Sequence, residues 1–176
     1  MTSRINRPPV FSVLDDAECR AVLSRNHVGR IAFIHERLVD IVPVSYTADG
    51  DWLFIRSAQG AKVEAFEHAP YVAFEVDEVR SATAWRSVVV HGTIYFLSAA
   101  GTASERQTHD RALSALGLGP DHVRGSDDRT PFRQIVYGIH VDKFTGRAAD
   151  PAGSSSGKAL PAPSPDLKEP PTKDGF

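Results

Sequence analysis

A short stretch containing Arg56, Gly60 and Lys62 holds the residue types that bind a phosphate group. An apolar run, residues 52–57, leads into a basic turn, and a helix is expected to begin at Gly60. Glycine lets the backbone approach an anion closely, and Lys62 falls in the first helical turn, where free N–H groups and the helix dipole favour negative charge. The same spacing also occurs in an ordinary turn flanked by a solvated arginine and a solvated lysine. The surrounding sequence is therefore needed to distinguish a phosphate site from such a turn.

The elements around this stretch have mostly strand character. Apolar, β-branched and alternating patterns, separated by turn residues, predict six strands. They are residues 28–34, 38–46, 52–57, 71–76, 84–97 and 133–141. Three runs predict helices: residues 15–26, capped by Ser12 or Asp15, residues 60–68 and residues 103–116. Six strands with few, peripheral helices predict a mainly β fold, a small antiparallel barrel.

Three features specify the strands further. Polar residues 35–37 predict a hairpin between the first two strands, and Asp49-Gly50 predicts the turn into the third. Pro43 has no N–H to donate, so its strand must be an edge or carry a bulge there, where something else can dock. Gly92, inside the long fifth strand, predicts a bend or bulge.

Length and composition predict one globular domain. The chain has 176 residues, of which 41% are hydrophobic, enough for one buried core. We expect an N-terminal extension over residues 1–10, the domain over 11–148, and a disordered tail over 149–176. The tail is rich in Pro, Gly and Ser, and such a composition buries too little apolar surface to offset the entropy lost on ordering.

The composition also argues against several classes of protein. A formal net charge of -2 gives no general attraction to nucleic acid or anionic membranes. No apolar run approaches the roughly 20 residues of a membrane span, so a cytoplasmic protein is expected. Cys19 is the only cysteine, which excludes an intrachain disulfide, and the seven histidines show no metal-binding spacing. His91 and His140 are interpreted as structural, and no serine lies in a nucleophile elbow.

Four segments, in this order, resemble the flavin-binding split-barrel superfamily, which includes pyridoxamine 5'-phosphate oxidases and nitroimidazole-resistance-type flavoproteins. They are residues 28–33, 41–50, 54–62 and 85–92, and residues 139–147 resemble the closing strand. The resemblance implies a six-stranded split barrel that forms a homodimer and holds flavin mononucleotide (FMN) in two equivalent clefts between the subunits.

The resemblance also assigns cofactor-binding residues by matching motif positions. They are Val44, Ser45, Tyr46, Arg56, Ser57, Ala58 and Lys62 of one subunit, with Trp85, Arg86 and Ser87 reaching the flavin from its partner. Arg56 and Lys62 suit the phosphate because charge-assisted hydrogen bonds are the strong ones. An alternative interpretation of residues 85–87, equally consistent with the sequence, is the end of a strand with a half-buried tryptophan and no contact with the flavin. No catalytic side chain is assigned, because a flavin carries the chemistry itself.

The chain departs from the pyridoxamine phosphate oxidases proper. Its second strand is apolar where theirs supplies basic residues, and it lacks their terminal segment with Trp and Arg. Pyridoxal phosphate synthesis is therefore not indicated, and the resemblance is closer to small bacterial flavoproteins. Three functions stay open: an FMN-dependent reductase of a small acceptor, with a nicotinamide nucleotide or another small redox partner; a deazaflavin-dependent reductase; and a non-catalytic flavin- or haem-binding module.

Overall fold

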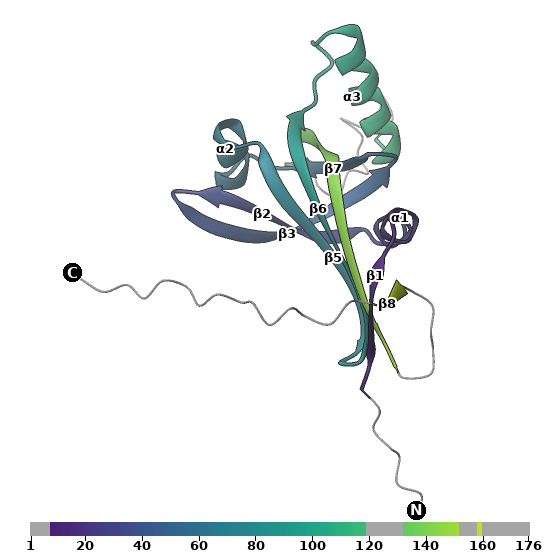
Figure 1. The fold of residues 1–176 in the computed structure, drawn as a ribbon. Helices are drawn as coiled ribbons and strands as arrows, with labels where there is room; N and C mark the ends of the chain where they lie inside the picture. The colour runs from purple at the N-terminus through teal and green to yellow at the C-terminus, as the bar shows by residue number, and fades with distance from the viewer. Residues whose placement is uncertain (1–7, 119–131, 152–157, 160–176) are drawn as a thin grey trace, which may run out of the picture.

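The computed structural model describes residues 8–118, 132–151 and 158–159, and this part of the chain is mainly β (Figure 1). Its elements, in chain order, are β1 (Val10–Leu14), α1 (Asp16–Arg25), β2 (Val28–His35), β3 (Leu38–Asp49), β4 (Trp52–Ser57), α2 (Ala61–His68), β5 (Tyr71–Ser81), β6 (Ala84–Phe96), α3 (Ala103–Ala115), β7 (Ile135–Asp150) and β8 (Lys158–Ala159). The mainly β class predicted from the sequence is confirmed.

Six antiparallel strands close the barrel. The strand order is β4-β3-β2-β5-β6-β7, and β4 pairs with β7 as well, which closes the ring. Alternating side chains fill the interior: Val72, Phe74 and Val76 of β5 are all buried, as their spacing predicted. Ile31 of β2 and Ile139 of β7 meet them in the same core. The predicted split barrel with peripheral helices is confirmed.

An arm of the sheet extends beyond the barrel, where β5, β6 and β7 run on together and β1 joins them (Figure 1). Here the structure differs from the predicted boundaries. The last strand does not end at residue 141 but continues to Asp150, and Ala148 and Ala149 are buried at 1% and 0% exposure. They pair with Ser12 and Phe11 of β1, a strand that the local sequence pattern did not indicate.

Both limits of the predicted domain therefore move outward. Val10 belongs to β1 rather than to an extension, and residues 149–150 belong to β7 rather than to a tail. The two-residue strand β8 adds to the other edge of β1. Residues 1–7, 152–157 and 160–176 lie outside the described part of the chain.

A bulge at Gly92 marks the passage from barrel to arm. The register between β6 and β7 shifts between His91 and Gly92, so Asp142 has no direct partner opposite it. A side chain at position 92 would collide with the carbonyl oxygen of His140, so glycine is required there by close backbone approach. The bend predicted at Gly92 is confirmed.

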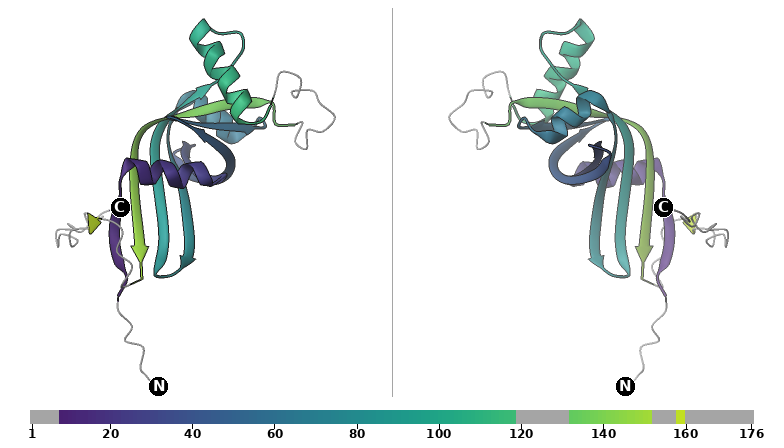
Figure 2. Two further views of the ribbon diagram at one scale, coloured as in Figure 1. Left: turned by 90° about the vertical axis from the view of Figure 1, so that its right-hand side faces the viewer. Right: turned by 90° about the vertical axis from the view of Figure 1, so that its left-hand side faces the viewer.

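The helices lie at the periphery. Helix α1 crosses the strands of the arm near the barrel, and a capping box between Asp15 and Glu18 begins it (Figure 2). Helix α3 stands at the end of the barrel opposite the arm (Figure 1). Arg111 of α3 forms an ion pair with Asp49, which ties this helix to the turn between β3 and β4. None of the described helices is long and apolar enough to span a membrane.

Candidate functional site

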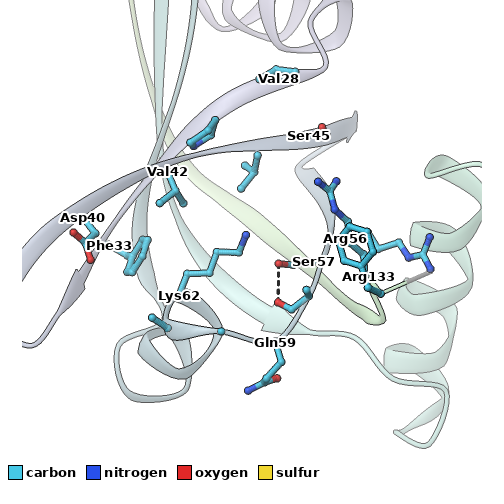
Figure 3. Close-up of a pocket in the computed structure, with 16 residues that line it drawn as sticks. Val28, Phe33, Asp40, Val42, Ser45, Arg56, Ser57, Gln59, Lys62 and Arg133 are labelled. Carbon is cyan, nitrogen blue, oxygen red and sulfur yellow. Dashed lines mark hydrogen bonds between the residues drawn. The ribbon is translucent and has the colours of Figure 1, made fainter. Parts of the chain in front are cut away.

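A cavity of about 620 Å³ lies between strand β3 and the segment that joins β4 to α2 (Figure 3). Its volume is in the range of small-molecule sites, about 300–1,000 Å³. It is lined by Val28, Phe33, Asp40, Val42, Pro43, Val44, Ser45, Arg56, Ser57, Ala58, Gln59, Gly60, Ala61, Lys62, Phe132 and Arg133. Six of the predicted site residues are thus brought together: Val44, Ser45, Arg56, Ser57, Ala58 and Lys62.

One side of the cavity is cationic. Strand β4 carries Arg56 and Ser57 to its end, and Lys62, on the first turn of α2, projects between them and β3 (Figure 3). The hydroxyl of Ser57 donates a 3.0 Å hydrogen bond to the carbonyl oxygen of Ala58. A hydroxyl rotates to suit its partner, so the same proton can be donated to a ligand oxygen. No atom lies within 4 Å of where a Cβ would stand on Gly60, which leaves its backbone accessible.

The electrostatics of Lys62 fit this role. Partial burial lowers the pKa of its ammonium group, and the positive charge of Arg133 lowers it further. In the ligand-free protein, the surroundings of Lys62 therefore disfavour its charged form. The negative charge of an anionic ligand would offset this lowering and favour the protonated lysine.

Arg133 is a site residue that the sequence analysis missed. It precedes β7, which pairs antiparallel with β4 so that Ile135 lies opposite Ser57 and Val136 opposite Arg56. The residues just before Ile135 therefore emerge beside the residues just after Ser57. Local pattern carries no signal for this placement, because it depends on the closure of the barrel.

The opposite wall of the cavity is apolar and comes from β3. Val42 and Val44 line it, together with Phe33 of β2, which has 5% of its surface exposed. Residues 38–45 of β3 pair with β2 on one side only, since pairing with β4 is limited to residues 46–49. Pro43 therefore lies on an open strand edge in the described structure, as its missing N–H predicted.

The end of the cavity away from the arginines contains Asp40 (Figure 3). It is the only carboxylate among the described lining residues, so the cavity is positive at one end and negative at the other. The sequence analysis missed Asp40 and Val42, although a signal was present. Val42 lies two residues and Asp40 four residues before Val44, so both share its face of the strand.

Tyr46 requires a correction. Its side chain does not line the cavity: it is buried at 2% exposure, and its hydroxyl donates a 2.7 Å hydrogen bond to the carbonyl oxygen of Leu23 in α1. Burial raises the pKa of this phenol. The ring packs edge-on against Phe74 in the core. Tyr46 therefore holds α1 to the barrel and contacts no ligand in this cavity.

The predicted partner-side segment lies elsewhere on the protomer, on the arm. The ring of Trp85 packs 6.2 Å from that of Phe11. Arg86 lies 3.7 Å from the carboxylate of Asp150, and the hydroxyl of Ser87 donates a 3.0 Å hydrogen bond to Glu75. Within one chain these side chains do not reach the 620 Å³ cavity. A role across a subunit interface stays a prediction.

The remaining candidate residues stand outside the cavity. His140 packs edge-on against Trp52 and lies 3.3 Å from Asp142, and His91 is exposed on the arm. Cys19 is buried under α1, which raises the pKa of its thiol to about 11, so it is a core residue of low reactivity. Among the described residues, no three His, Cys, Asp or Glu side chains gather as a metal site would need.

The fold and the cavity together define a class: a six-stranded split barrel with a cationic cavity beside an open strand edge. Comparison with protein families assigns the chain within this class. Residues 15–148 match the family model described as pyridoxamine 5'-phosphate oxidase. The chain belongs to this family.

Individual relatives agree with the assignment. An uncharacterized protein of Rhizobium meliloti is 26% identical over 147 residues, covering 78% of this chain and 94% of its own. The crystal structure of a FAD-binding protein from Mesorhizobium loti is similar with a TM-score of 0.64 and 27% identity, covering 81% of this chain and 98% of that one. A Bacteroides thetaiotaomicron structure, provisionally described as a 5-nitroimidazole antibiotic resistance protein, has a TM-score of 0.59 at 17% identity, with coverages of 81% and 90%. This last likeness is one of fold.

Proposed function

We propose that this protein binds FMN in the 620 Å³ cavity and acts as a flavin-dependent reductase of a small acceptor. The observation that carries the proposal is the placement of Arg56, Ser57 and Lys62 directly beside the open edge of β3. A phosphate group and a planar ring joined by a short polar chain match these two adjoining surfaces. The FAD-binding relative from Mesorhizobium loti supports a flavin as the ligand class.

Each group of residues has a distinct task in this proposal. Arg56 and Lys62 hold the phosphate by charge-assisted hydrogen bonds, and Ser57 adds a hydroxyl donor. Val42, Pro43 and Val44 form the apolar wall for the ring, and the free backbone groups along the strand edge orient its polar rim. The bound flavin would supply the hydride and electron transfer. The cationic end also fixes which way round the ligand lies, because Asp40 at the other end repels a phosphate.

The proposal includes a homodimer. Large apolar side chains are exposed at the tip of the β2–β3 hairpin, with Ile34 at 59%, Leu38 at 69% and Val39 at 70%. They adjoin a cavity that is open on one side of β3, and an apolar patch of this kind marks an interaction surface. A second copy of the chain would cover the patch and supply Trp85, Arg86 and Ser87 to the ring. A nicotinamide nucleotide is the proposed electron donor.

The test is a titration of the purified, flavin-free full chain with FMN. We expect quenching of flavin fluorescence with a stoichiometry of one flavin per chain. Titration with a deazaflavin coenzyme runs in parallel, since the same phosphate and ring contacts suit both. Tight binding of the deazaflavin without any response to FMN would overturn the FMN proposal. Binding of FMN without reoxidation by any nitro or quinone acceptor would leave a non-catalytic flavin carrier.

A further inference from the structure

We propose that Lys62 is an acylation site, modified by small acyl phosphates whose phosphate group binds among the cationic side chains of the cavity. The inference concerns the chemistry of the lysine itself, and its main test needs no flavin. Its consequence, that acylation and flavin binding exclude each other, rests on the proposed function. Lys62 is the one lysine among the described lining residues of the cavity.

The position of Lys62 places its amine between two different surfaces. The side chain extends from the first turn of α2 and ends between the side that carries Ser57 and the apolar wall of β3 (Figure 3). Within the described part of the chain, no hydrogen bond or ion pair holds its ammonium group. A lysine in an ion pair is kept protonated, whereas Lys62 is available for reaction once it loses a proton.

The surroundings of Lys62 increase the share of its neutral, nucleophilic form. Burial lowers the pKa of its ammonium group, and the positive charge of Arg133 lowers it further. Only the neutral amine attacks a carbonyl carbon, and desolvation beside another cation is a known way to activate a lysine. The other charged groups of the cavity are Arg56, which is also cationic, and Asp40 at the far end. We therefore expect Lys62 to be more reactive at neutral pH than a solvated lysine.

An acyl phosphate matches the two surfaces beside the amine. Its phosphate group suits Arg56, Arg133 and the hydroxyl of Ser57, while its short acyl chain suits the apolar wall of β3. The carbonyl carbon joins these two parts of the molecule, just as Lys62 lies between the two surfaces. A reagent held in this orientation reacts as if it were present at a high effective concentration.

The reaction transfers the acyl group without any oxidation or reduction. The neutral amine of Lys62 attacks the carbonyl carbon, a C–N bond forms, and the C–O bond to the phosphate breaks. The phosphate leaves with the bonding electron pair and takes one proton from the amine, so the products are an amide and hydrogen phosphate. The amide carries no positive charge, which removes the charge-assisted hydrogen bond proposed for the flavin phosphate.

The experiment treats the flavin-free full chain with acetyl phosphate and follows each lysine by peptide mass spectrometry. The chain has five lysines, and exposed Lys143 on β7 is the internal control in the same sample. A parallel sample receives the N-hydroxysuccinimide ester of acetic acid, which transfers the same acyl group without a phosphate. Arg133→Ala tests the activation. Arg106→Ala is its matched control, because Arg106 lies on α3 with its guanidinium bonded to the carbonyl of Gly101.

We expect acetyl phosphate to modify Lys62 at least about tenfold faster than Lys143, and the ester to show a smaller ratio because it lacks the phosphate. Arg133→Ala should slow the modification of Lys62 by acetyl phosphate roughly fivefold or more, since it removes a phosphate contact and part of the activation. Arg106→Ala should leave both rates unchanged.

Two results would overturn the proposal. One is a Lys62 that reacts with acetyl phosphate no faster than Lys143 does. The other is the same preference for Lys62 with both reagents, because the phosphate would then play no part. Both comparisons use the wild-type chain, so they hold even if a variant fails to fold.

A final sample adds FMN at a concentration where titration shows binding, and Lys62 should then be protected from acetyl phosphate. Bound FMN that leaves the reaction of Lys62 at its full rate would overturn the mutual exclusion. If FMN does not bind at all, the proposed function fails, while the comparison of Lys62 with Lys143 still decides the acylation site.

Discussion

The hydroxyl of Tyr46 donates a 2.7 Å hydrogen bond to the carbonyl oxygen of Leu23, whereas its neighbours Val44 and Ser45 line the cavity. Leu23 belongs to the last part of α1, whose final carbonyl groups have no partner within the helix. Tyr46 therefore stabilises the contact between helix and barrel, and its role can be separated experimentally from ligand binding.

We predict that Tyr46→Phe lowers the free energy of unfolding by about 1–2 kcal/mol, because it leaves a buried carbonyl without its partner. Flavin affinity should stay unchanged. Tyr137→Phe is the matched control: its hydroxyl is also buried, but it has no hydrogen-bond partner among the described residues, so removing it should be neutral or slightly stabilising. Urea unfolding measures both. A loss of flavin binding in Tyr46→Phe with unchanged stability would contradict this assignment.

The phosphate end gives a second prediction. Hydrogen bonds to charged groups contribute about 1.5–3 kcal/mol each, so Arg56→Ala and Lys62→Ala should each weaken FMN roughly ten- to more than a hundredfold. Riboflavin, which lacks the phosphate, should bind wild type and variants alike. Lys143→Ala, at an exposed lysine on β7, is the control. Normal FMN binding by both variants would place the phosphate elsewhere.

The lowered pKa of Lys62 leads to a third prediction, on pH. The folded, ligand-free protein disfavours the charged lysine relative to the unfolded chain, so Lys62 costs stability below its folded pKa. That cost disappears as the pH rises through the folded pKa towards 10.5, the ordinary value. Lys62→Met should therefore raise the melting temperature of the ligand-free protein at neutral pH, while it weakens FMN.

FMN affinity of the wild type should decrease over the same alkaline range, because the phosphate binds the protonated lysine, and binding should take up protons there. Titrations in two buffers of different ionisation enthalpy measure this uptake. A Lys62→Met protein that is less stable than wild type at neutral pH would show that the lysine stem contributes more by packing than its charge costs.

The fourth prediction concerns assembly. We expect sedimentation velocity to show a homodimer whose interface belongs to the class of roughly 2,000 Å² or more that permanent dimers form. Flavin binding and dimerisation should strengthen each other if the site is shared. Trp85→Ala should weaken flavin from across the interface. A monomer that binds flavin stoichiometrically at low concentration would exclude the roles proposed for Trp85, Arg86 and Ser87.

The fifth prediction separates the arm from the tail. Truncation after Arg147 removes Ala148 and Ala149, which are buried between β1 and β6, and should cost about 2 kcal/mol or more of stability. Truncation after Ala159 removes only the segment whose composition predicts no core contribution, and should change stability by less than about 0.5 kcal/mol. Thermal unfolding of both proteins, with flavin content as a second measurement, tests the new boundary.

Local sequence was sufficient wherever neighbouring residues decide the structure. The alternation of Val72, Phe74 and Val76 predicted the buried face of β5, and Asp49-Gly50 predicted the turn before β4. Arg56, Gly60 and Lys62 were expected to lie together, and they line one cavity, because a strand end and the first turn of the next helix are adjacent in the chain as well as in space. These are short-range relationships, and residue type and spacing carry them completely.

Only the tertiary structure decided the relationships between distant segments. Strand β1 exists because the far end of β7 offers it hydrogen bonds, and Arg133 reaches the cavity because β7 closes the barrel on β4. Tyr46 matched the motif by position, yet a carbonyl of α1 determined where its hydroxyl points. Each of these outcomes depends on a partner far away in the chain, and no local periodicity records which partner a strand edge or a polar group will find.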